Sequence, residues 1–174
     1  MSDIYMEYMI KKKPDAAVWT RRVTIWLTMG LVVLLAVASL PFFMSLAFLI
    51  LPAACLLIWG LKILHKRLNV EYEYTLTNNE LDIAAIYGQS RRKKLLTVDC
   101  RSFELFAPDK EEYKSEYESQ TVTKRLDYSS SPKAERRCFA VFNDKGGARA
   151  VVFFEPTDRM KDAMKVYLRN KFKE

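Results

Sequence analysis

Four consecutive basic residues, Arg91-Arg92-Lys93-Lys94, form the one stretch of this sequence whose residue types favour ligand binding. Because side chains alternate along a strand, Arg92 and Lys94 would share one face, and Arg91 and Lys93 the other. Such a cluster beside a turn could bind an anionic headgroup or an acidic partner. It could also be a solvated charge run that protects a sheet edge, or be neutralised within the chain by the acidic residues of 109–118.

Side chains for nucleophilic or metal chemistry are sparse. The single histidine, His65, lies in a basic stretch, whereas a catalytic triad needs a histidine beside a nucleophile and zinc sites combine several His or Cys ligands. Cys55, Cys100 and Cys138 form no CxxC pair, so we expect them to be reduced packing residues. The sequence therefore predicts no enzyme, no metal site and no cofactor.

The net charge of +7 arises from 28 Lys and Arg against 21 Asp and Glu in 174 residues, half of which are hydrophobic. That hydrophobic content excludes a disordered chain. Most of the basic excess lies in the first 69 residues, and the remainder is nearly balanced, which disfavours nucleic-acid binding. We expect the basic residues around the apolar run to orient it and to contact membrane lipids: Lys11, Lys12, Lys13, Arg21, Arg22, Lys62, Lys66 and Arg67.

No charged residue occurs in the 39 positions from Val23 to Leu61. A single helix of that length would measure about 58 Å, roughly twice the hydrocarbon thickness of about 30 Å. Pro41 lies near the middle and disfavours a continuous helix. The run therefore predicts a transmembrane helical hairpin over 22–64, with helices at about 22–39 and 43–64.

Both outer ends of this hairpin are basic and its turn is uncharged, which predicts a multi-pass protein of the plasma membrane with both termini cytoplasmic. Residues 1–21 would form a basic cytoplasmic segment. A signal peptide cleaved after Ala36-Val37-Ala38 is the competing interpretation, although a membrane span would survive that cleavage. Small residues in the hairpin leave homo-oligomerisation through it open.

Residues 65–174 show the pattern of a soluble domain. The alternation of Val70–Thr77 is that of a half-buried strand, and Thr157 can cap a helix over 157–172. Further strands are expected at 81–87, 93–98, 101–106, 118–126, 138–142 and 148–154. Most of 107–135 is expected to form a long acidic loop. Seven strands followed by one helix predict an α+β, mainly β fold: a seven-stranded, partly open pleckstrin-homology-like (PH-like) barrel with a C-terminal helix. A different helix-on-sheet α+β fold is the alternative.

The segment Val70–Ala107, with the strand Glu71–Thr77, Leu81-Asp82-Ile83 and the basic run 91–94, resembles a bacterial family of unknown function. Phe154-Glu155-Pro156-Thr157 before the last helix is similar too. Members of that family carry two N-terminal membrane spans and a cytosolic domain related to bacterial PH-like domains. The resemblance implies this fold and topology and brings no functional residue.

The sequence thus favours a non-enzymatic, membrane-tethered module that presents a PH-like domain to a protein partner at the inner leaflet. One alternative is an anionic-lipid headgroup binder that uses Arg91–Lys94. A third interpretation is an accessory subunit of a membrane transport complex, since the hairpin has too few polar residues to line a pore alone.

Overall fold

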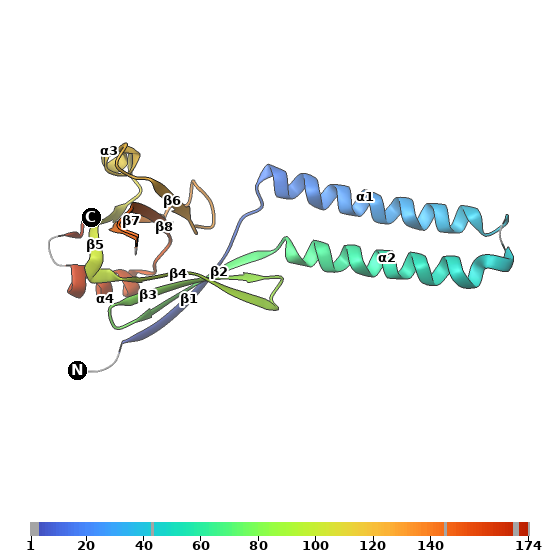
Figure 1. Ribbon diagram of the computed structural model, residues 1–174, viewed down its shortest axis with the longest axis horizontal. Helices are drawn as coiled ribbons and strands as arrows, with labels where there is room; N and C mark the ends of the chain where they lie inside the picture. The colour runs from blue at the N-terminus through green and yellow to red at the C-terminus, as the bar shows by residue number, and fades with distance from the viewer. Residues whose placement is uncertain (1–3, 43, 145, 169–170, 174) are drawn as a thin grey trace. The chain divides into compact units, whose positions relative to one another are not determined.

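The computed structural model describes residues 4–42, 44–144, 146–168 and 171–173 (Figure 1). The chain divides into two compact units. One is helical and covers residues 14–70; the other is the β domain, built from the chain on both sides of it.

The helical unit contains α1 (Ala16–Ser39), the short 3₁₀ helix η1 (Met44–Leu46) and α2 (Ala47–Arg67), with α1 and α2 side by side (Figure 1). Leu40, Pro41 and Phe42 form the turn that Pro41 predicted. Most apolar side chains of both helices are exposed, and the spans 16–39 and 44–67 are each long and apolar enough to cross a membrane. The first helix begins at Ala16, earlier than the predicted 22, and ends at Ser39 as predicted. The second begins at Ala47, later than the predicted 43, and ends at Arg67, three residues beyond the predicted 64.

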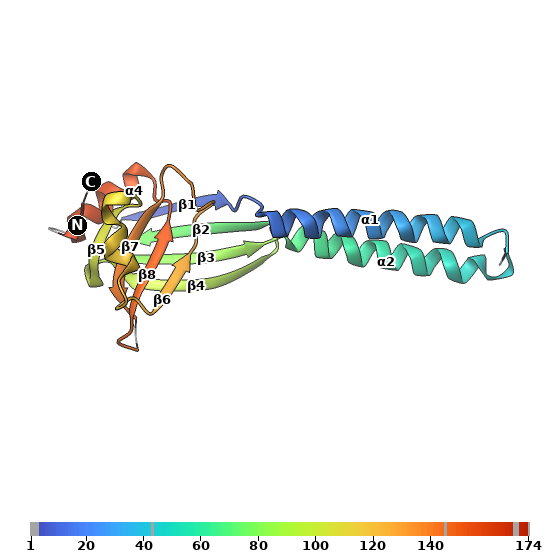
Figure 2. The same ribbon diagram turned by 90° about the horizontal axis from the view of Figure 1, so that it is seen from above.

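The β domain consists of two four-stranded sheets within the described residues. The first has the order β1 (Tyr5–Lys11), β2 (Val70–Thr77), β3 (Glu80–Tyr87) and β4 (Arg91–Asp99), seen side by side in Figure 2. The second has the order β5 (Phe103–Pro108), β7 (Cys138–Asn143), β8 (Arg149–Phe154) and β6 (Lys124–Asp127). In the part of the chain that the structure describes, the two sheets are not closed into a barrel and have eight strands in place of the predicted seven. The predicted order of two helices, sheets and a final helix is confirmed.

The additional strand is β1, in the segment predicted to be only a basic cytoplasmic extension. It pairs antiparallel with β2, from Tyr5 opposite Thr77 to Lys11 opposite Glu71. The Lys13 N–H then donates to the Ser130 carbonyl at 2.8 Å. The whole helical unit is therefore an insertion between two neighbouring strands of one sheet.

Residues 107–135 are more structured than the predicted acidic loop. They form η3 (Glu111–Tyr113), α3 (Lys114–Glu118) and β6, which is shorter than the predicted strand 118–126 and pairs parallel with β8. The buried Tyr117 ring packs against Phe139 and Phe153, at centroid distances of 4.8 and 5.1 Å. This segment covers one face of the second sheet, because that face carries an apolar cluster that needs a cover.

The main core includes fully buried aromatic side chains, among them Tyr74, Phe106 and Phe154. The helix α4 (Asp158–Leu168) contributes its buried Met160 and Met164. The Thr157 hydroxyl accepts the Met160 N–H at 3.3 Å, which confirms the predicted cap. The predicted extension to 172 runs through 169–170, which lie outside the described residues; beyond them, the Phe172 ring stacks on Phe106 at 5.3 Å.

We expect the β domain to fold without the helical unit when β1 is retained. Replacing residues 14–69 by Asn-Gly, a turn suited to an antiparallel hairpin, should give a protein that stays soluble without detergent and unfolds cooperatively. Removing residues 1–13 as well should lower the free energy of unfolding by at least about 3 kcal/mol, since burial of Ile10 and its neighbours is lost. Chemical denaturation measures both values; equal stability of the two variants would contradict the role of β1.

Candidate functional site

The basic run occupies the first four positions of β4, and all four side chains are exposed. Arg92 forms an ion pair with Glu73 of β2 at 2.6 Å, and Lys94 forms one with Asp82 of β3 at 2.9 Å. Asp82 also accepts the Thr97 hydroxyl at 2.5 Å. Arg92 and Lys94 thus point to the same face, as their spacing indicated.

These partners correct one expectation: Arg92 and Lys94 are paired with acids of β2 and β3, and not with the acidic residues of 109–118. Glu73 is only 5% exposed, so Arg92 serves to compensate a buried carboxylate. Arg91 and Lys93 alternate onto the opposite face, and no ion pair of either is found in the described part of the chain. Only half of the run is therefore available to a ligand.

Further contacts balance the acidic charge on the face of the first sheet that carries Glu73 and Asp82. Lys11 lies 3.7 Å from Glu71, its partner in the β1–β2 ladder. Within β1 itself, the Tyr5 hydroxyl donates to Glu7 at 2.9 Å. Oppositely charged neighbours stabilise adjacent strands, so these contacts serve the sheet itself.

The other basic residues around the apolar run lie on different elements of the structure. Lys11 is the last residue of β1, and Lys12 and Lys13 follow it, whereas Arg21 and Arg22 lie on α1 and Lys62, Lys66 and Arg67 on α2. The Arg22 guanidinium donates to the Asn69 side-chain oxygen at 2.7 Å, which links α1 to the segment after α2. The His65 ring lies edge-on to Trp26 at 5.9 Å. The structure brings no group of three potential metal ligands together in the chain that it describes.

A groove of about 360 Å³ lies between the edge strands β4 and β6. Leu95, Leu96, Leu126 and Tyr128 supply its apolar lining. Lys94 and Lys124 also line it, and the Lys124 ammonium lies 2.9 Å from Asp144. This groove could not be predicted from the sequence, because it depends on where β6 lies, and β6 is placed by its long-range parallel pairing with β8.

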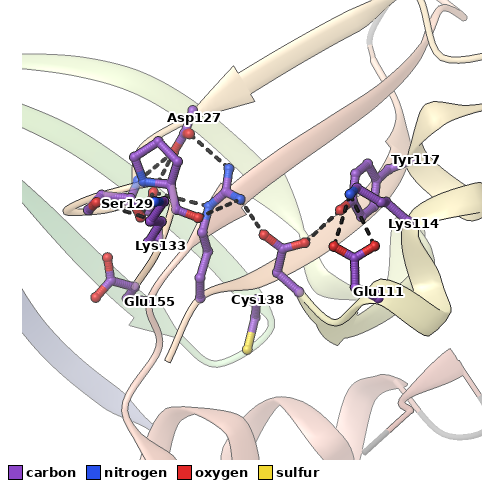
Figure 3. A network of polar contacts seen from close by, with 12 residues as sticks. Glu111, Lys114, Tyr117, Asp127, Ser129, Lys133, Cys138 and Glu155 are labelled. Atoms are coloured by element: carbon purple, nitrogen blue, oxygen red, sulfur yellow. Dashed lines mark hydrogen bonds and ion pairs between the residues drawn. The ribbon is translucent and has the colours of Figure 1, made fainter. Parts of the chain in front are cut away.

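A polar network surrounds Arg137, in which the guanidinium contacts Asp109 and donates to Asp127 at 2.8 Å and Ser129 at 3.2 Å (Figure 3). The Tyr117 hydroxyl donates to Asp109 at 2.7 Å. Burial and this bond to a carboxylate raise the pKa of Tyr117. The network joins three segments of the β domain. The donors of Arg137 already have partners and its side chain is only 11% exposed, so few of its hydrogen-bond donors are accessible to a ligand.

Two of the cysteines, Cys100 and Cys138, have the environments of packing residues. Cys100 and Cys138 are buried and not disulfide-bonded, whereas Cys55 is exposed on α2. Burial raises the pKa of the Cys100 thiol to about 12 and that of Cys138 to about 11. At neutral pH both thiols therefore stay protonated, and a protonated thiol is a poor nucleophile.

The structure defines a class of protein: a two-sheet β domain with a C-terminal helix, into which two helices of membrane-spanning length are inserted after the first strand. The family model described as a bacterial PH-like domain (DUF6106) matches residues 2–174. The chain belongs to this family of unknown function, which confirms the resemblance drawn from its strand and basic-run motifs. No curated protein and no solved structure matches the chain.

Arg92 and Arg91 should differ sharply in their effect on stability. Arg92→Ala leaves the buried Glu73 carboxylate unpaired and should cost about 1–2 kcal/mol, a value reduced from that of a fully buried pair because Arg92 is itself largely exposed. Arg91→Ala, the matched control on the same strand, should change stability by less than about 0.5 kcal/mol. Adding Glu73→Gln to Arg92→Ala should recover most of the loss. Denaturant titration measures all three variants, and equal costs for the two arginines would refute the assignment.

Proposed function

We propose that this chain is a non-enzymatic, membrane-tethered interaction module. Its helical hairpin anchors the PH-like domain at the inner leaflet of the plasma membrane, with both termini in the cytoplasm, and the domain binds a protein partner. The observation that carries the proposal is the insertion of two helices of membrane-spanning length between the paired strands β1 and β2.

The pairing of β1 with β2 supports a hairpin topology. These strands belong to one sheet, so the residues before and after the helices must occupy the same compartment. That requires an even number of membrane crossings, which two helices satisfy. The basic residues at the outer ends of the helices favour the cytoplasm as this compartment.

The chemistry of the described side chains supports binding over catalysis. The buried thiols are held protonated, and the Arg137 network is occupied by internal partners. An anionic-lipid headgroup remains the second candidate ligand, because Arg91 and Lys93 are exposed and the anchor would keep them close to a membrane. An accessory subunit of a transport complex would be one form of the same module.

Three single cysteines test the topology in a Cys55→Ala background. Tyr5→Cys, Val166→Cys and Phe42→Cys replace exposed residues of β1, α4 and the helical turn. In right-side-out vesicles, a membrane-impermeant maleimide should label Phe42→Cys alone, and in inside-out vesicles it should label the other two alone. Labelling of Tyr5→Cys and Val166→Cys from opposite sides would refute the hairpin.

Partner binding is tested by exchanging the β domain. Residues 14–69 would be kept, and the sequences on both sides replaced by an unrelated soluble domain. In-cell crosslinking should recover a specific partner with the full chain and lose it with the exchanged chain, since the proposal places recognition in the β domain. The same partners in both, or none across growth conditions, would contradict the proposal.

A further inference from the structure

The two sheets have four outer edges, and another part of the described chain occupies that of β5. The edge of β5 is met by the C-terminal segment, where Phe106 bridges Phe172 and the Lys173 N–H donates to the Phe106 carbonyl at 2.9 Å. Beyond the end of β1, the Lys13 N–H donates to the Ser130 carbonyl. By contrast, β4 pairs only with β3 and β6 only with β8 among the described residues. The outer edges of β4 and β6 therefore keep peptide groups that lack a strand partner.

These two open edges border the groove described above. A β-bulge lies opposite Ile83 and Ala84, where Leu95 is the extra residue of β4. Leu95, Leu126 and Tyr128 are half-buried in the groove, which has the volume of a small binding cleft. Apolar lining between strand edges that lack partners suits an extended peptide better than a compact polar ligand.

The charges around the groove select the chemistry of that peptide. Asp82 and Asp144 already pair with Lys94 and Lys124. Arg91 and Lys93 lie on the face of β4 opposite these pairs, the face that Leu96 shares, and neither has an ion pair within the described ranges. Arg91 and Lys93 do not line the groove, but they directly precede the β4 residues that do, Lys94–Thr97, and leave a positive excess at that end of the strand.

We propose that the groove between β4 and β6 binds an extended acidic segment of a partner protein, which adds as a strand to the free edge of β4. Acidic side chains at alternate positions of this segment meet Arg91 and Lys93, and apolar side chains on the same face meet Leu96 and Tyr128. The proposal rests on the proposed function and specifies which kind of partner the module takes. It also gives Arg91 and Lys93 a role that the paired Arg92 and Lys94 do not share.

The test uses the full chain in nanodiscs of zwitterionic lipid and a fluorescent peptide, Val-Thr-Val-Thr-Glu-Thr-Glu, whose glutamates stand at alternate positions. Fluorescence anisotropy should show saturable binding, and Arg91→Glu with Lys93→Glu should weaken it by about tenfold or more. The matched control carries the same charge change at two exposed loop positions, Lys133→Glu with Arg136→Glu, and should bind within about twofold of the unmodified chain. A peptide with lysine in place of glutamate should not bind.

Strand addition is tested by the peptide backbone. Methylating every valine and threonine amide removes the hydrogen-bond donors and keeps the charge, so it should abolish binding. Bound peptide should slow amide hydrogen exchange in β4 and leave β1 unchanged. Equal binding of the methylated peptide, unchanged affinity of the Arg91/Lys93 variant, or protection away from β4 would each overturn the proposal.

The remaining outcomes separate this inference from the proposed function. Absence of peptide binding up to about 1 mM, with a partner still recovered through the β domain, would overturn the groove assignment alone. Absence of both would overturn the two together. If phosphatidylglycerol vesicles bind through Arg91 and Lys93 while the peptide does not, the site is a lipid site and the proposal is wrong.

Discussion

The pairing of β1 with β2 is the interaction on which the arrangement of this protein depends. It joins residues 5–11 to residues 71–77 across the whole helical insertion. The entropic cost of closing a loop grows only with the logarithm of its length, and this connection is itself folded as two helices. A long insertion between adjacent strands is therefore compatible with a stable sheet, and it attaches the β domain at two points of the chain instead of one.

In the basic run, internal pairing distinguishes two residues from the other two. Arg92 and Lys94 compensate Glu73 and Asp82, so that acidic side chains can occupy the face of a sheet. Arg91 and Lys93 lie one position away and point to the other face. A uniform stretch of four cations thus contains two that pair with acidic residues of the sheet and two that are exposed on an edge strand.

The sequence predicted those features that depend on local pattern. The alternation of Val70–Thr77 predicted β2, Pro41 predicted the turn between the helices, and Thr157 predicted the start of α4. The strand β1 was missed because Tyr5 and Met9 are apolar yet exposed on the outer face, so the alternation that identifies a half-buried strand is hidden.

The groove and the Arg137 network could not be predicted, because both depend on long-range placement. The groove needs β6 to pair with β8 in parallel, and the network joins Asp109, Tyr117, Asp127 and Ser129 to Arg137. Local sequence gives no sign of these contacts. The ion pairs of the basic run could not be predicted either, since Glu73 and Asp82 are brought near β4 only by the order of strands in the sheet.

The most direct measurement of the central claim is a disulfide across β1 and β2 in the membrane-embedded chain. Glu7 and Thr75 are partners in the ladder, so Glu7→Cys with Thr75→Cys, in a Cys55→Ala background, should oxidise readily to an intramolecular disulfide. In the control, Glu7→Cys with Leu76→Cys, the second thiol is one residue away and faces the core, so it should remain reduced. Equal oxidation of both pairs, or oxidation of neither, would contradict the pairing on which this account rests.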